Sequence, residues 1–453
     1  MTATQSDVFV IIGAGSTVFT PGLLTDLARS PAFADATVRL VDVRPEAAET
    51  MVAVGRRIAA ENGSALAVEA VADRRTALRG ATFVTTTIAT GSAESWKRDL
   101  DIPLQFGIRQ TVGDSVGPGG VFRALRHVPE LLAIAKDIAD VAPDAYLFNY
   151  SNPLTANVRA IVRETPVRAF GLCHGAMHTK SAIAEALGVA SSDLTATFAG
   201  LNHVSWLMDL RVGHTDLYPR FRELVSGQAA GADAPSSRVE GPHAPVSADL
   251  LRLYGLYPAP GDRHVAEFFD GYLRGDGPEL SWGLQGGLDA THEYIAEKGE
   301  LWEHLHEFAE GRGSGHGFAD KEAERLVAIA GAIRTGRPTH ELAVNLPNTG
   351  LVSNLPDSAI VEVPAIVDAD GVRGMPVGPL PGAVATQLTQ RVHQQEATVD
   401  AAISGRRDLA IQSLVLDPLV PDGETAEALL DAAVSADPTH LGRYATATTV
   451  PGP

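Results

Sequence analysis

The chain has 453 residues, of which 45% are hydrophobic and 20% charged, so its composition is that of a folded globular protein and excludes a disordered one. The formal net charge is −19 and no run is rich in Lys or Arg, which excludes the basic surface of a nucleic-acid-binding protein and disfavours an anionic membrane as a partner. No apolar run approaches the ~20 residues that span a bilayer. The single cysteine excludes an internal disulfide, and the first residues lack the features of a signal peptide, so we expect a cytoplasmic protein.

The first third of the chain alternates short apolar strands with helical stretches, the pattern of a parallel sheet with crossover helices. Strands are predicted at Val8–Ile12, Val38–Val43, Thr82–Thr90, Ala145–Tyr150 and Val167–Leu172, and helices at Pro21–Arg29, from the second strand to about Glu61, and at Val128–Val141. Each strand ends in a polar or glycine-containing loop, which is where doubly wound folds bind ligands. We therefore predict an α/β fold with a Rossmann-type doubly wound parallel sheet.

The composition changes after about Leu210. Ser226–Ser247 is rich in Ala, Gly, Pro and Ser and is predicted to form a long mobile loop. A strand is predicted at Val361–Val367, and helices around Ala248–Tyr254, Ala290–Phe308, Asp320–Arg334, Val384–Ser404 and Glu424–Ala433. We predict an NAD-binding domain over residues 1–200 and a second, mixed α/β domain over residues 201–453 for substrate binding and oligomerisation.

A glycine loop follows the first predicted strand. Gly13 and Gly15 precede a helix, so backbone N–H groups of this loop would meet a pyrophosphate at the helix N-terminus. Asp42 closes the second strand, where an acid binds the adenosine ribose, and it favours NAD over NADP. Val18 stands at the third glycine position, so the fingerprint is incomplete, and the nearby Arg44 leaves NADP open.

The only cysteine, Cys173, stands at the end of an apolar strand and next to His174. A second polar segment, Gly200–Trp206, supplies His203. A thiolate and an imidazole would form an open two-ligand site for a divalent metal, with substrate oxygens completing the coordination. A lone cysteine is more often a small buried hydrophobic residue, so spacing alone leaves both interpretations open.

Three loops concentrate polar residues, and the one that contains Asn152 falls at the predicted ligand edge of the sheet. Gly113–Gly120 (GDSVGPGG) contains Asp114, and its glycines indicate either a tight turn or a backbone that approaches a ligand closely. Asn152 belongs to a frequent turn motif. Gly261–His264, followed by Glu267, crowds ionisable residues together, which surface solvation explains more often than catalysis does.

Together these segments resemble glycoside hydrolase family 4, the NAD-dependent glycosidases that also need a divalent metal. The resemblance runs through GAGS, GDSVGPGG, FNYSNPL, GLCHG, GLNHVSW and PAPGDRHVAEF to Val344–Val363 and Asp417, and so covers nearly the whole chain. The most similar pattern is that of the α-glycosidase and α-uronidase branch. His174 and Gly175 differ from the Asn or Asp with a nearby Pro that marks 6-phosphoglycosidases, so we expect a substrate without phosphate.

The resemblance implies roles for individual residues of this chain. NAD would be held by Gly13, Gly15, Ser16 and Asp42, the metal (usually manganese) by Cys173 and His203, and the sugar by Asn152, with His174 beside metal and sugar. Asp262 matches the catalytic base of the non-phosphorylated α-branch. Asp114 falls near the expected acid for the leaving group.

The family's chemistry lies outside the usual two-carboxylate scheme of glycosidases. The resemblance implies that NAD takes hydride from C3 of the sugar while the metal stabilises an enediolate. The base then removes the C2 proton and the glycosidic oxygen leaves by elimination. Water adds at C1 and the hydride returns to C3, so the net reaction is hydrolysis.

The glycone is predicted to be a hexuronic acid, glucuronic or galacturonic. Arg263, next to the proposed base, would pair with the C5 carboxylate bidentately. Against this, the Cys-His-Gly element also occurs in members that act on neutral α-glucosides, and Arg263 would also be able to pair with Asp262 or Glu267. An α-glucosidase or α-galactosidase therefore stays open, as do an NAD-dependent sugar dehydrogenase and a catalytically silent nucleotide sensor. The resemblance also implies a homodimer or homotetramer.

Overall fold

A computed structural model describes residues 6–228, 244–274, 280–315 and 325–446. The strands are β1 Val8–Ile12, β2 Thr37–Val41, β3 Ala67–Ala70, β4 Phe83–Thr86, β5 Tyr146–Asn149, β6 Arg168–Gly171, β7 Leu194–Leu201, β8 Val204–Val212, β9 Thr215–Asp216, β10 Tyr257–Ala259, β11 Thr339–Pro347, β12 Ile360–Asp368 and β13 Gly371–Gly374. The helices are α1 Thr20–Arg29, α2 Pro45–Glu61, α3 Arg74–Leu78, α4 Ser92–Gln105, α5 Gly117–Val141, α6 Leu154–Glu164, α7 Gly175–Leu187, α8 Tyr218–Gln228, α9 Pro245–Tyr254, α10 Asp262–Ala266, α11 Gly287–Ala309, α12 Arg325–Thr335, α13 Gly382–Ser404, α14 Arg407–Val415, α15 Gly423–Ala436 and α16 Pro438–Leu441.

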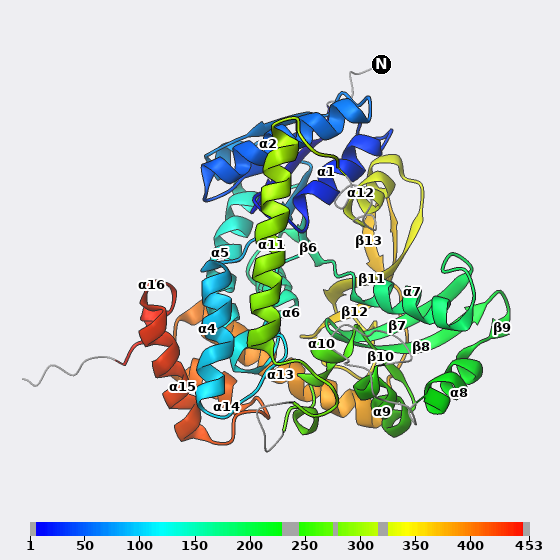
Figure 1. The fold of residues 1–453 in the computed structure, drawn as a ribbon, viewed down its shortest axis with the longest axis vertical. Coiled ribbons are helices and arrows are strands. Elements are labelled where there is room, and N and C mark those ends of the chain that lie inside the picture. The colour runs from blue at the N-terminus through cyan, green and yellow to red at the C-terminus, as the bar shows by residue number, and fades with distance from the viewer. Residues whose placement is uncertain (1–5, 229–243, 275–279, 316–324, 447–453) are drawn as a thin grey trace, which may run out of the picture.

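The N-terminal half of the sheet is parallel, in the order β6-β5-β4-β1-β2-β3. Alternate residues of β1 point to opposite faces: Phe9 packs with α1 and α2, whereas Val10 packs with α3, α5 and α6. Helices therefore cover both faces of the parallel strands (Figure 1). The Rossmann-type doubly wound prediction is confirmed, and all five predicted strands are present, although the third ends at Thr86.

The second half of the sheet is antiparallel and continues the first half without a break. The connection is made by β11, where Asn345 pairs with Gly171 of β6. Strands β12, β7, β8 and β10 follow outward. The boundary predicted at residue 200 lies inside β7. The two predicted domains contribute strands to one continuous sheet. The separate roles assigned to them stay a prediction.

Most predicted helices are present, but two segments differ from expectation. Helix α5 begins at Gly117 and not near Val128, because Pro118 suits the first turn of a helix; the GPGG part of the predicted loop is helical. The predicted Ser226–Ser247 loop lies largely outside the described residues, and the ends that are described belong to α8 and α9. The start predicted for α12 also lies outside them. Among the described helices, none combines the length and apolarity needed to cross a bilayer.

Candidate functional site

The loop after β1 contains the predicted cofactor residues. Gly13 has a φ of +90°, and a Cβ there would lie 2.7 Å from the carbonyl oxygen of Thr87, so only glycine fits. The N–H of Gly15 donates to Oδ2 of Asp42 at 2.7 Å, and Ser16 follows directly. The structure thus brings together the four predicted residues where β1 and β2 end and α1 begins.

Asp42 also orders the residues after β2. Its Oδ1 accepts the N–H of Arg44 at 2.9 Å. The Arg44 guanidinium lies over the ring of Trp302 in α11, 5.8 Å from the ring centroid. An acid at the end of β2, beside a glycine loop, is the arrangement that fits the ribose of NAD.

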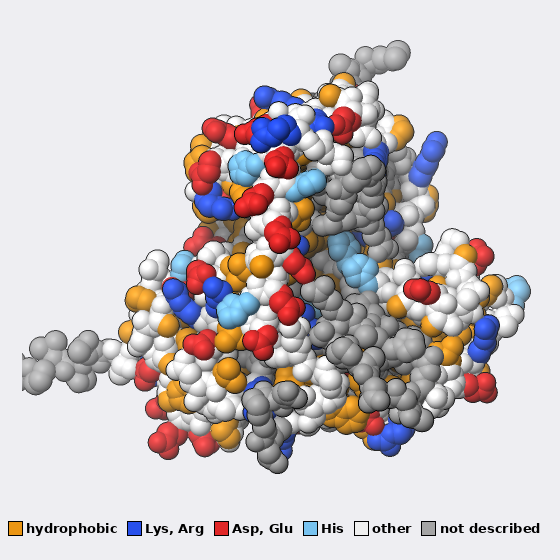
Figure 2. Space-filling model, in the orientation of Figure 1, with side chains coloured by type: hydrophobic (Ala, Val, Ile, Leu, Met, Phe, Trp, Pro, Cys, Tyr) orange, Lys and Arg blue, Asp and Glu red, His pale blue; other side chains and the backbone are white. Residues whose placement is uncertain are grey.

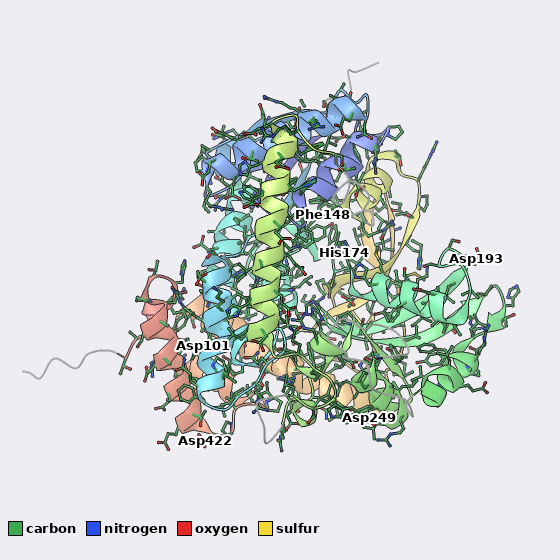
Figure 3. All side chains as sticks on the ribbon, in the orientation of Figure 1. Asp101, Phe148, His174, Asp193, Asp249 and Asp422 are labelled. Atoms are coloured by element: carbon green, nitrogen blue, oxygen red, sulfur yellow. The ribbon has the colours of Figure 1, made fainter. Side chains whose placement is uncertain are left out.

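A cavity of about 210 Å³ opens at the carboxyl ends of β5 and β6. It is lined by Phe19, Tyr150, Asn152, Leu154, Leu172, Cys173, His174, Gly175, His178, His203, Pro260 and His264. In Figure 3, His174 lies near the middle of the view, and Figure 2 shows histidine side chains in a hollow near the middle of the same face. Four predicted residues, namely Asn152, Cys173, His174 and His203, therefore share one cavity.

Cys173 is half-buried and its Sγ accepts the N–H of Gly175 at 3.5 Å. Burial, assisted by the charge of Glu362, raises the pKa of the thiol to about 12. The described residues contain no group of three or more side chains that would hold a metal by themselves. Cys173 and His203 line the same cavity, so a metal held by them would need other ligands, and their role as ligands stays a prediction.

His203 occupies the tight turn between β7 and β8, with a φ of +68°. Its Nδ1 lies 3.0 Å from Oγ of Ser115, and its ring centroid is 4.4 Å from that of His264. The segment interpreted from the sequence as a polar cluster is therefore the tip of a β-hairpin, which extends His203 into the cavity wall.

Asp114 lies beside the cavity and is 8% exposed. Asn152 Nδ2 donates to its Oδ2 at 2.6 Å, Ser115 Oγ donates to its Oδ1 at 2.8 Å, and His203 Nδ1 is 3.7 Å from Oδ1. Burial raises the pKa of Asp114, but the electrostatic interactions with its neighbours, Arg123 among them, outweigh burial and hold the pKa below its ordinary value. The carboxylate is therefore ionised at neutral pH.

Asp262 is placed differently from the other predicted catalytic residues. It is 1% exposed and does not line the cavity. Its Oδ2 accepts the N–H of Val246 at 2.7 Å, and its Oδ1 accepts the N–H and Oγ–H of Ser247 at 2.8 and 2.7 Å, so the carboxylate caps the start of α9. Burial raises its pKa despite these donors. Its role as base stays a prediction.

Arg263 is also not among the residues that line the cavity. Its Nη2 donates to the carbonyl oxygen of Thr111 at 2.9 Å, and Oγ1 of Thr111 donates back to the carbonyl of Arg263. The guanidinium thus binds the loop that leads to Asp114. Its predicted contact with a substrate carboxylate stays a prediction.

Two histidines of the cavity have no role in the sequence-based prediction. His178 follows His174 by one turn of α7, and this i, i+4 spacing is a signal that would have placed it on the same helix face. His264 stands two residues after Asp262. Burial lowers the pKa of His264 to about 3, so its imidazole is neutral.

Comparisons with known proteins identify the family of the chain. A family model described as "Family 4 glycosyl hydrolase" matches residues 8–189, and its C-terminal domain model matches residues 198–420. An α-glucosidase of Erwinia rhapontici is 33% identical, over 94% of this chain and 97% of its own. An α-galacturonidase of Bacillus subtilis (strain 168) is also 33% identical, over 93% and 95%.

A solved structure shares the fold over nearly the whole chain. A 6-phospho-α-glucosidase from gut microorganisms, in complex with NAD and Mn²⁺, superposes with a TM-score of 0.81 at 23% identity, covering 96% of this chain and 99% of its own. The two family models together span most of the sequence, and the relatives match at nearly full length. The chain belongs to glycosyl hydrolase family 4.

Proposed function

We propose that this enzyme hydrolyses a non-phosphorylated α-glycoside with NAD and a divalent metal, Mn²⁺ in the first instance. The observation that carries the proposal is the cavity itself. Cys173, His174, His203 and Asn152 line it together, and the ionised carboxylate of Asp114 is hydrogen-bonded to Asn152 beside it. Family membership and the NAD and Mn²⁺ bound by the structural neighbour support both cofactors.

The proposed role of each residue follows from its place in the site. When bound, NAD supplies a hydride acceptor and the divalent cation a Lewis acid. Gly13, Gly15, Ser16 and Asp42 would hold NAD, while Cys173 and His203 would hold the cation. His174, at the N-terminus of α7, would orient sugar hydroxyls together with Asn152.

Asp114 is suited to carry a proton. Because its carboxylate is ionised at rest, its Oδ2 would accept a proton released by a sugar hydroxyl and return it to the departing glycosidic oxygen. Asp262 is the proposed base for the C2 proton. Its raised pKa makes it a stronger base than an ordinary aspartate, although its three present donors must be released first.

The proposed reaction is tested by incubating the enzyme with an aryl α-glycoside, NAD, Mn²⁺ and a thiol. We expect catalytic release of the free sugar without accumulation of NADH, because the hydride returns within each turnover. One NADH formed per sugar would instead identify a dehydrogenase. The absence of both products with every α-glycoside would leave a nucleotide-binding sensor.

The cysteine provides a prediction about the metal. Since the pKa of Cys173 is about 12, binding of Mn²⁺ to the thiolate must release a proton. We expect the affinity for Mn²⁺ to rise about tenfold per pH unit between pH 6 and 8, measured by electron paramagnetic resonance titration and calorimetry. Cys173→Ser should lose this pH dependence and most turnover while NAD still binds. Unchanged Mn²⁺ affinity in Cys173→Ser would show that the thiol is not a ligand.

Variants of Asp262 separate its proposed role as the base for the C2 proton from its structural role as the cap of α9. In Asp262→Asn the amide oxygen still accepts from one of the two sites at the start of α9, while its NH2 group faces the other donor, so the protein should fold with a lowered melting temperature. Loss of the base should slow exchange of the C2 proton with solvent by about 10²–10⁴-fold, measured by NMR in D₂O. Asp262→Ala serves as the comparison, because it loses cap and base together. If Asp262→Asn exchanges at the wild-type rate, Asp262 is a structural cap only.

We further propose that the glycone is a hexuronic acid. A galacturonidase and a glucosidase of equal identity stand among the relatives, so the support comes from the arginines near Asp114. Arg263 binds Thr111 on the loop that leads to Asp114. Arg123 donates from Nε to the carbonyl oxygen of Asn152 at 3.1 Å, immediately behind the cavity wall.

A panel of α-linked galacturonic acid, glucuronic acid, galactose and glucose substrates tests the glycone. We expect the uronides to react fastest. Arg263→Ala should then cost about 2–5 kcal/mol in kcat/KM on the uronide and little on the neutral sugar, because only the uronide loses a charge partner. Arg123→Ala is the matched variant. An equal loss on both sugars would make Arg263 a support for Thr111, and faster turnover of a neutral sugar by the wild type would reject the hexuronic acid.

We also propose a cytoplasmic homodimer or homotetramer. A thiolate ligand requires a reduced cysteine, which supports a reducing compartment. Light scattering measures the assembly directly, and a monomer at working concentration would reject the second part of this proposal.

A further inference from the structure

Glu267, immediately after α10, makes an unusual set of hydrogen bonds. It is 2% exposed, and its Oε1 accepts the backbone N–H groups of Thr111 at 2.9 Å, Val112 at 2.8 Å and Gly113 at 2.8 Å. These are the three residues that directly precede Asp114. One carboxylate oxygen therefore fixes the path of the chain into the site.

The chain is also held after Asp114. The N–H of Gly117 donates to Oδ2 of Asp417 at 2.9 Å. Arg391 joins the two anchors, because its Nη1 binds the same Oδ2 at 2.6 Å while its Nη2 donates to the carbonyl oxygen of Glu267 at 2.8 Å. The segment that bears Asp114 is thus fixed at both ends by buried charged residues.

Between these anchors, Asp114 makes short contacts that depend on its position. Its Oδ2 lies 2.6 Å from Asn152 Nδ2, and Ser115 bridges its Oδ1 to His203. A shift of the segment by about 1 Å would break such contacts and misplace a group that must exchange a proton with the substrate.

A buried glutamate is a costly choice for a purely structural contact. Taking a carboxylate out of water costs several kcal/mol, and apolar packing of similar volume is often at least as stable. Burial raises the pKa of Glu267 to about 7 in spite of its three backbone donors. The N–H groups of residues 111–113 need an acceptor, which apolar packing would not supply, and Glu267 is the acceptor that fixes all three at one point.

We propose that Glu267 is a positioning residue for the reaction, which acts by holding residues 111–113 so that Asp114 meets the leaving-group oxygen. The proposal rests on the proposed function, since it takes Asp114 to be the group that protonates this oxygen. Glu267 itself does not line the cavity.

Two substrates with the preferred glycone separate positioning from general damage: a methyl α-glycoside, whose leaving group needs a proton, and a 4-nitrophenyl α-glycoside, whose leaving group needs it much less. In Glu267→Asp the carboxylate is one methylene shorter and retracts from the three N–H groups. We expect its kcat to fall about 100-fold on the methyl glycoside but less than tenfold on the nitrophenyl glycoside, with KM little changed. Glu267→Gln retains an acceptor oxygen at the original reach, so its kcat should stay within about tenfold of wild type on both.

Asp114→Asn is measured in parallel, because it tests the role of Asp114 separately from the role of Glu267. If Asp114→Asn shows the selective loss on the methyl glycoside and Glu267→Asp loses equally on both, Glu267 is only structural and the inference is overturned. If Asp114→Asn shows no selectivity, the proton-carrying role of Asp114 is wrong and the inference falls with it. Glu267→Ala adds a larger displacement. Should it not fold, the Asp and Gln variants still decide the question.

Discussion

The site depends on a buried carboxylate at the junction of the two halves of the sheet. Glu362 of β12 is 3% exposed and accepts from Ser205 Oγ at 2.8 Å, Asn345 Nδ2 at 3.0 Å and Asn202 Nδ2 at 3.4 Å. Asn345 belongs to the strand that pairs with Gly171 of β6, and Ser205 to β8. One side chain thus ties the hairpin of β7 and β8 to β11, the strand that borders the parallel half.

This junction explains how two distant segments reach one cavity. Cys173 follows β6 by two residues, and His203 is next to Asn202 in the hairpin turn. Asn202 hydrogen-bonds both Glu362 and the thiol of Cys173. It therefore links Cys173 to the hairpin turn that bears His203, the other proposed ligand. The negative charge of Glu362 adds to burial in keeping the thiol protonated. A divalent cation would reverse this balance, since it stabilises the thiolate and offsets the nearby carboxylates.

The sequence predicts those parts of the molecule that local patterns determine. Apolar runs ending in glycine identify β1 and its loop, and the family resemblance identifies residues such as Cys173 that stand at strand ends. The sequence does not show contacts between backbone and distant side chains. Glu267 binds amides more than 150 residues earlier in the chain, and any residue type has such amides. The sequence does not show the cap that Asp262 provides for α9 either. Its partners are the backbone N–H groups of Val246 and Ser247, 16 and 15 residues earlier, and no residue type marks them.

The glycines of GDSVGPGG left two interpretations open in the sequence. Their number indicated either a tight turn or a backbone that approaches a ligand closely. In the structure, a Cβ at Gly119 would lie 2.8 Å from the carbonyl oxygens of Asp99 and Gly113, and one at Gly120 would lie 2.6 Å from the backbone of Ser115. These glycines therefore allow the loop to fold against the first turn of α5, and with the anchors on either side this packing leaves Asp114 few positions. The close contacts of these glycines therefore support the tight turn, and the proposed chemistry is left to Asp114, the carboxylate that the loop presents beside the cavity.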